Sequence, residues 1–277
     1  MSTAKTLALL NCIIVTINFS WIILIDNSYF FGHSINSAIS EYPTYLTPDP
    51  ITFKIWSFLA ANMILVGVLM YIASKNEQEN ARTLKKVEKI GNLLLVNQLF
   101  CGMSMVLKLN DQFILSVICS LGCLITILLI NRKIEIHKLV SNSITRYFIR
   151  LGFGVYTGWM IVIAAFNSVI IVTKYELITN SIEMFGLNLA ILVAATVYAI
   201  YYTISHNLPA VSVVMAWGVF GILLKNINSP FYIQPDMKPY LFILLAATVL
   251  SSAYSFYRCN VRRGTAVDFN ENPPSIS

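Results

Sequence analysis

The sequence predicts an all-α protein, a polytopic transmembrane helical bundle with about eight spanning helices and both termini in the cytoplasm. Of the 277 residues, 57% are hydrophobic and only 12% are charged, whereas about 25% of residues are charged in soluble domains. A bilayer core about 30 Å thick needs roughly 20 apolar helical residues to cross it. The charges occur in groups, and most of the uncharged runs between them have about this length. These runs are 6–25, 55–74, 90–107, 112–131, 151–173, 184–224 and 239–257.

The run 184–224 is about twice as long as the others and carries the turn signal Asn207-Leu208-Pro209 near its middle, so we expect two helices there. The runs lack a period-two alternation of apolar residues, which favours helices over a membrane barrel. The expected helices are 7–25, 52–73, 90–107, 113–131, 152–173, 185–203, 209–224 and 240–257.

The first helix could be confused with a cleaved signal peptide. Its uncharged run is longer than the apolar region of a signal peptide, and no small-x-small cleavage site follows Ile25, so a retained anchor helix is expected. The short connections 108–112 and 204–208 make the flanking helices antiparallel neighbours. The polar segment 75–89 is expected to extend the second or third helix, and the tail 258–277 is expected to be disordered.

Basic residues set the expected orientation. If the N-terminus is cytoplasmic, 14 of the 19 lysines and arginines fall in cytoplasmic segments, which is the bias that determines topology. Basic loops that face anionic lipid also account for the net charge of +6. Because no aromatic residues are interleaved with these charges, a nucleic-acid partner is not predicted. The predicted partner is membrane lipid, and the sequence does not identify which membrane.

The sequence contains no pattern typical of an enzyme or a metal site. Intramembrane catalysts and ion-coupled pumps usually bury ionisable groups, and none lies inside the expected spans. Cys119 and Cys123 lie one helical turn apart, but no histidine or carboxylate is near them in sequence, so we interpret them as packing residues. No enzymatic activity is predicted, although this absence does not bear on chemistry performed on a bound cofactor. Neutral amides are expected to hydrogen-bond between helices, namely Asn11, Asn18, Asn62, Asn92, Asn97, Gln98, Asn167 and Asn188.

Gly154 and Gly158 form a GxxxG motif that lets two helices approach closely. Packing within the bundle is the favoured interpretation, because eight helices make many internal contacts. A homodimer through this motif is the alternative.

The connection 26–50 is rich in aromatic residues and contains Pro43, Pro48 and Pro50. Prolines lower the entropy lost when a loop becomes ordered, and aromatic side chains supply apolar area to bury. Such a loop can fold over the end of the bundle as a lid. It can equally form the aromatic belt that membrane proteins place at the lipid interface, and composition does not decide between the two.

Two stretches resemble a known family. Residues 42–56 read YPTYLTPDPITFKIW, which resembles the Pro-x-aromatic-x-x-Pro…Phe-x-x-Trp pattern before helix two of the tryptophan-rich sensory protein (TspO/MBR, translocator protein) family. The residues from Tyr156 through Trp159 to Asn167 are similar to the family's Tyr-x-x-Trp…Asn in helix five, and Gln98-Leu99 occurs where the family tends to have it. The family's Asn-x-x-Trp in helix three reads Gly-Met-Ser-Met here, at 102–105.

The resemblance implies a five-helix bundle over 1–173 and three additional helices over 174–257, as in the longer members of that superfamily. It further implies a non-enzymatic membrane protein that binds, senses or moves a hydrophobic ligand, such as a bound porphyrin or lipid, in an intramembrane pocket under the helix 1–2 loop. A facilitative transporter for a small polar solute is the alternative. By matching position, the implied lid and rim residues are Tyr42, Pro43, Pro48, Phe53 and Trp56, and the implied pocket residues are Gln98, Tyr156, Trp159 and Asn167.

Overall fold

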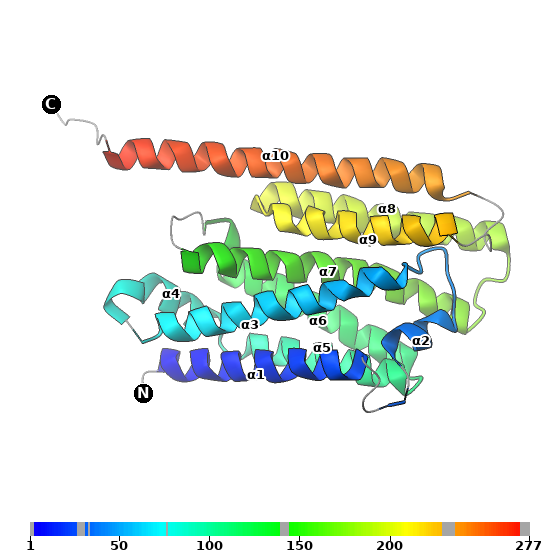
Figure 1. Cartoon of the computed structure of the whole chain (residues 1–277), viewed down its shortest axis with the longest axis horizontal. Helices are drawn as coiled ribbons and strands as arrows, with labels where there is room; N and C mark the ends of the chain where they lie inside the picture. The colour runs from blue at the N-terminus through cyan, green and yellow to red at the C-terminus, as the bar shows by residue number, and fades with distance from the viewer. Residues whose placement is uncertain are drawn as a thin grey trace.

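The computed structural model describes residues 3–26, 31–32, 34–75, 77–138, 144–228 and 236–271, and these residues form helices and turns without a strand. The helices are α1 (Thr3–Asp26), α2 (Ile35–Ser40), η1 (Pro50–Lys54), α3 (Ile55–Ala73), α4 (Glu77–Ile90), α5 (Leu93–Leu109), α6 (Phe113–Lys133), η2 (Ile136–Lys138), α7 (Ile144–Lys174), α8 (Ser181–His206), α9 (Pro209–Asn228) and α10 (Lys238–Glu271). The long helices lie side by side in one bundle (Figure 1). The predicted all-α fold is confirmed.

In the described part of the chain, seven helices are long and apolar enough to cross a membrane. The remaining predicted span, 90–107, corresponds to α5, which has 17 residues. Together with the end of α4 it forms a pair of helices that is bent by 55°. The bend occurs at Gly91, whose φ of +53° lies in the left-handed region that favours glycine. The polar segment 75–89 therefore forms most of a separate helix instead of a straight extension of its neighbours.

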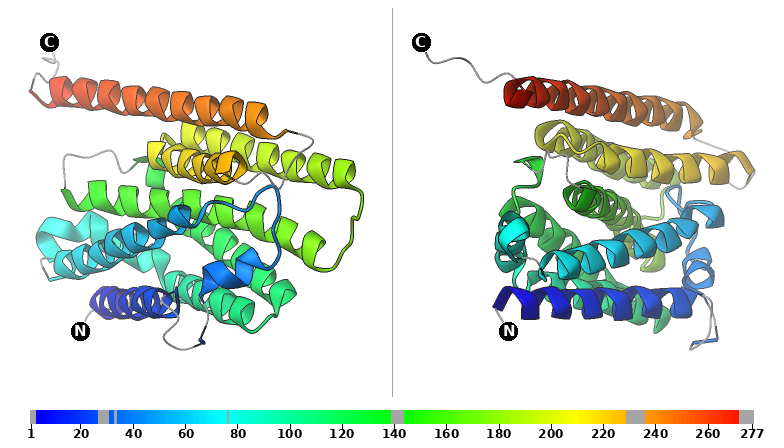
Figure 2. Two further views of the ribbon diagram at one scale, coloured as in Figure 1. Left: turned by 45° about the vertical axis from the view of Figure 1, so that its right-hand side comes forward. Right: turned by 60° about the vertical axis from the view of Figure 1, so that its left-hand side comes forward.

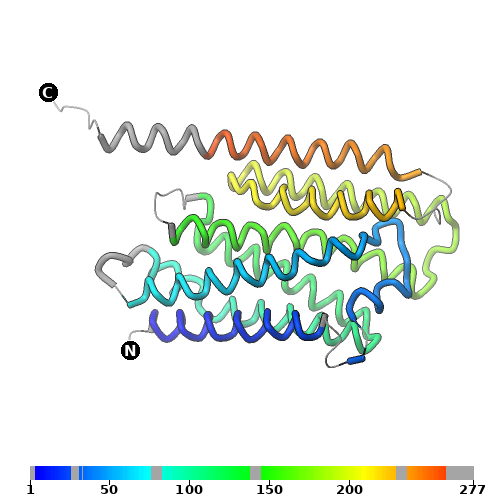
Figure 3. The backbone as a smooth tube through the Cα atoms, viewed as in Figure 1, coloured from blue at the N-terminus to red at the C-terminus, as the bar shows by residue number. Residues whose placement is uncertain are grey.

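The centre of the bundle is α7. Of the residues in its apolar window, 83% are buried, against 22% to 67% in the other candidate spans. Figure 2 shows α7 between α3 and α6 on one side and α8 and α9 on the other, with α10 outermost. The trace in Figure 3 shows that α10 runs toward the end of the bundle at which α1 begins. We call the opposite end, where α2 lies, the distal end.

Large apolar side chains cover the outside of the bundle. On α8 and α10, Val197, Tyr201, Ile243 and Leu250 are 59%, 64%, 66% and 69% exposed. A surface of this kind matches hydrocarbon, because burying it in lipid removes apolar area from water. The chain is an integral, multi-pass membrane protein.

The turn predicted at 207–209 is confirmed. Asn207 follows the end of α8 in the left-handed region with φ of +52°, and α9 begins at Pro209, where the missing N–H is not needed. One expectation fails at the C-terminus: α10 continues to Glu271, although 258–277 was expected to be disordered. No proline occurs in the chain between Pro239 and Pro273, so nothing breaks the helix before that point. Residues 272–277 lie outside the described residues, as do Tyr29 and Phe30 of the aromatic connection.

The GxxxG motif packs inside the bundle. A Cβ added to Gly154 would lie 3.0 Å from the Ala210 side chain, and one added to Gly158 would lie 2.8 Å from the Val211 carbonyl oxygen. From the other side, Gly218 of α9 lies against Val162 of α7. The absence of side chains at these positions lets α7 and α9 approach closely, and this face of α7 is covered by α9.

Candidate functional site

The segment 41–54, which we call the cover segment, folds across the distal end of the bundle between α2 and α3 (Figure 1). It is held in shape by a compact turn in which the Thr47 backbone N–H donates to the Thr44 carbonyl at 3.1 Å, and the Thr44 backbone N–H donates to the Thr47 hydroxyl at 2.7 Å. Asp49 then accepts from the Ile51 backbone N–H and caps η1, which leads directly into α3.

Three hydrogen bonds between described residues tie the cover segment to α9. The Asp49 backbone N–H donates to the Gly221 carbonyl at 2.9 Å, and the Trp217 indole donates to the Thr52 carbonyl at 3.0 Å. The Asn226 amide donates to the Tyr45 carbonyl at 3.3 Å. The Tyr45 ring also meets Phe185 of α8 edge to face at 5.6 Å, and burial raises the pKa of its phenol.

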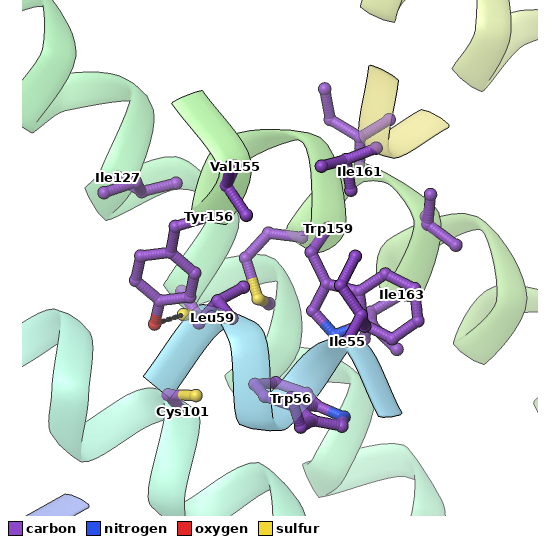
Figure 4. Close-up of a cluster of buried hydrophobic side chains, with 14 of the residues drawn as sticks. Ile55, Trp56, Leu59, Cys101, Ile127, Val155, Tyr156, Trp159, Ile161 and Ile163 are labelled. Carbon is purple, nitrogen blue, oxygen red and sulfur yellow. Dashed lines mark hydrogen bonds between the residues drawn. The ribbon is translucent and has the colours of Figure 1, made fainter. Parts of the chain in front are cut away.

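An aromatic cluster lies directly beneath the cover segment. The Trp159 ring of α7 meets Phe53 at 6.2 Å and Trp56 at 5.9 Å, both edge to face, which is a favoured geometry for aromatic pairs. Figure 4 shows Trp56 and Trp159 facing each other across the α3–α7 contact. Trp159 is fully buried, and its indole N–H has no hydrogen-bond partner.

Two further predicted site residues belong to a polar network that joins four helices. Gln98 of α5 accepts from the Asn18 amide of α1 at 2.8 Å and donates to Asn97 at 3.1 Å. Asn97 in turn donates to the Cys123 carbonyl of α6 at 2.8 Å, and the Cys123 thiol shares a hydrogen bond of 3.1 Å with the Tyr156 hydroxyl of α7. These amides hydrogen-bond between helices, as predicted.

The structure also reveals a buried lysine that the sequence analysis placed outside the spans. Lys108 is 4% exposed, and its ammonium donates to the Asn167 amide oxygen at 2.6 Å. Asn167 donates in turn to the Ser120 hydroxyl at 2.9 Å. One sequence signal could have found Lys108: it follows Ser104 by four residues, so a polar face continues along α5 to its last turn.

Small cavities remain beneath the cover segment. One of about 10 Å³ is lined by Pro48, Phe53 and Trp159 among mostly apolar neighbours. Another of about 10 Å³ is lined by Phe53, Trp56 and Lys108, together with residues of α2. Phe53 and Ile163 line both, so these two side chains separate them. Each volume suffices for about one water molecule, so the site is closed in this conformation.

The nine predicted site residues therefore occupy three kinds of place. Those that line the two cavities are Pro48, Phe53, Trp56 and Trp159. Those that belong to buried polar networks are Gln98, Tyr156 and Asn167. Gln98, Tyr156 and Asn167 line neither cavity. The remaining two belong to neither group: Tyr42 packs on Phe113 at 5.3 Å, and Pro43 is exposed. Within the described residues no group of three or more His, Cys, Asp and Glu side chains could hold a metal ion.

Comparison with known proteins gives one family. A family model described as TSPO-like protein matches residues 7–255, which is most of the chain: it covers most of α1, every element from α2 to α9 and the first half of α10. No curated protein and no solved structure matches the chain.

Proposed function

We propose that this chain, which belongs to the TSPO-like protein family, binds a hydrophobic ligand of tetrapyrrole or lipid type in an intramembrane chamber beneath the cover segment. The observation that carries the proposal is the position of Phe53. This side chain of the cover segment lies between two cavities, and the wall of each cavity includes one tryptophan, Trp159 of α7 or Trp56 of α3. A flat apolar ligand needs aromatic walls and a few neutral polar groups, and both are present here.

The packing of the cover segment agrees with a lid. Residues 44–48 are buried within the protein, whereas residues of an interfacial belt would face lipid. Pockets for ligands of this size usually measure about 300–1,000 Å³. The ligand must therefore displace Phe53 and the cover segment, and so it selects an open conformation.

Opening the lid breaks its hydrogen bonds to α9 and also withdraws the buried side chains of Phe53 and Leu46 from the core. The three hydrogen bonds to α9 contribute about 1 kcal/mol each, so breaking them costs a few kcal/mol. The apparent affinity is lower when a smaller fraction of the molecules is open. A mutation that loosens the cover segment should therefore raise the apparent affinity.

The proposed activity is binding, with sensing or movement of the ligand as its consequence, and no enzymatic step is assigned. The alternative of polar-solute transport gains no support from the buried amides. Asn18, Gln98 and Asn97 donate to one another or to α6, so a polar solute would have to replace hydrogen bonds that the protein already makes.

The test is quenching of intrinsic tryptophan fluorescence by protoporphyrin IX, with the full chain in nanodiscs. The chain has four tryptophans, so each single variant keeps three reporters. Replacing Trp56 or Trp159 by leucine should weaken binding about tenfold, because a buried aromatic contact contributes more than about 1 kcal/mol. Trp21→Leu is the matched control, since Trp21 lies in a groove between α1 and α5 and not beside the chamber. Wild-type affinity in both chamber variants would exclude the chamber as the binding site.

A further inference from the structure

We propose that the chamber selects ligands that carry a carboxylate on a large apolar body, and that Lys108 binds this carboxylate. The inference rests on the proposed function and specifies its ligand class.

Lys108 is a buried cation without a counter-charge. Its ammonium has three donors, and the Asn167 oxygen uses one of them. Among the residues that the structure describes, Lys108 forms no ion pair: Asp111, three residues further along the chain, pairs instead with Lys174. Burying an unpaired charge inside a membrane protein costs several kcal/mol, and intramembrane ionisable groups commonly mark functional sites.

The surroundings of Lys108 are apolar or already hydrogen-bonded. Ile35 and Ile39 of α2 line the same cavity, together with Phe53. The hydroxyls of Ser104 and Ser120 also line it, but each donates to a backbone carbonyl of its own helix. The cavity therefore holds an ammonium with unused donors in an apolar wall.

A second unused donor belongs to a residue that lines the neighbouring cavity. The indole N–H of Trp159 is buried without a partner, and the Trp159 side chain lines the cavity on the other side of Phe53. Withdrawal of Phe53 would open the two cavities toward each other, beside Ile163, into one chamber lined by Lys108 and Trp159. Among the residues that the structure describes, no carboxylate belongs to either lining.

The complementary ligand is an anion with an apolar body. A carboxylate accepts hydrogen bonds through both oxygens and carries one charge, which matches the single lysine. The carboxylate could belong to a tetrapyrrole propionate or to a fatty acid, and both have the required chemistry.

The experiment compares acids with their neutral analogues. The full chain is placed in nanodiscs of phosphatidylcholine, which has no net charge, and quenching is titrated with protoporphyrin IX and with its dimethyl ester. Oleate and oleyl alcohol are then used to displace the porphyrin. Because hydrogen bonds to charged groups are the stronger ones, the wild-type chain should prefer each acid about tenfold or more.

The variants separate the role of Lys108 from general electrostatics. Lys108→Met removes the charge, while Lys108→Gln keeps a donor for Asn167 and serves if the methionine variant does not fold. In both, the affinity for the acid should fall to that for the ester, and the ester should bind as before. Lys54→Met is the matched control: Lys54 is an exposed lysine of the cover segment, next to Phe53, and its loss should leave the preference unchanged.

The outcomes are distinguishable. Preference for the acid in only one of the two ligand pairs supports the proposal and identifies the source of the carboxylate. Equal binding of acid and ester by the wild-type chain would overturn carboxylate selection and leave the proposed function intact. A preference that persists in the Lys108 variants would overturn the role of Lys108. Absence of binding by all four probes would overturn the proposed function itself.

Discussion

Replacing Gly221 by alanine should push the cover segment away from α9. The added Cβ would lie 1.9 Å from the Thr52 hydroxyl oxygen, 2.7 Å from its methyl carbon and 2.8 Å from its Cβ. Real Cβ atoms essentially never approach another atom closer than 3.0 Å, so η1 would have to move. The movement would strain or break the hydrogen bonds from Asp49 to Gly221 and from Trp217 to Thr52.

The expected loss of stability is about 2–4 kcal/mol. Overpacking of a well-packed contact costs about 1–3 kcal/mol, and the two hydrogen bonds contribute about 1 kcal/mol each. The higher helix propensity of alanine returns about 1 kcal/mol. For a chain of this size, each kcal/mol lowers the unfolding midpoint by roughly 2–4 °C, so thermal unfolding in nanodiscs should detect the change.

Two further variants isolate the clash. Gly186 is an exposed glycine near the start of α8, and an added Cβ would meet nothing within 4 Å. Gly186→Ala should therefore stabilise the protein slightly. Replacing Thr52 by glycine in the Gly221→Ala background removes all three close contacts and should recover part of the loss. If Gly221→Ala proves as stable as Gly186→Ala, the close contact between the cover segment and α9 does not exist.

Two other predictions follow from the site and the topology. Phe53→Ala should enlarge the space between the two cavities, because removal of a buried phenylalanine ring leaves a void. Denaturant unfolding should show a free energy of unfolding lower by about 3–5 kcal/mol. A loss below about 1 kcal/mol would show that Phe53 does not fill this space. Lys54 and Lys133 are exposed. Lys54 directly precedes α3 and Lys133 ends α6, and the start of α3 and the end of α6 lie at opposite ends of the bundle (Figure 1), so Lys54→Cys and Lys133→Cys test the orientation. A membrane-impermeant maleimide added to intact cells should label Lys54→Cys and not Lys133→Cys, after the labelling of the native cysteines is subtracted, whereas the reverse pattern would invert the predicted orientation.

The spans could be predicted because lipid imposes a length and a composition on every crossing helix. Lys108 could not be found in this way. A search for uncharged runs ends at the first charge, and a lysine at the end of a run is normally assigned to the interface, where its long side chain reaches water. Its spacing from Ser104 indicates that it shares a polar face of α5 but not that it is buried. The packing of α2 and α7 around the end of α5 buries it, and this packing is a tertiary feature.

The motif before α3 lies in the cover segment, but it does not indicate which side chains of this segment face inward. That the segment acts as a lid stays a prediction. Pro43 and Pro48 belong to the same motif, yet Pro43 is exposed and Pro48 lines a cavity. In a strand or a helix, a fixed period determines which residues share a face, but an irregular loop has no such period. The hydrogen bonds to α9 were equally unpredictable, because Trp217 and Thr52 are 165 residues apart in sequence.

The contacts of α9 bear on the role of the three additional helices. The division of the chain at residue 173 remains a prediction, but the closed site depends on residues from both sides of it. Without α9, the cover segment would lose its bonds to Gly221, Trp217 and Asn226, and the glycine face of α7 would be uncovered. A ligand that opens the chamber must break these same bonds. The stability of the closed conformation, and with it the apparent affinity for ligand, is therefore set in large part by α9.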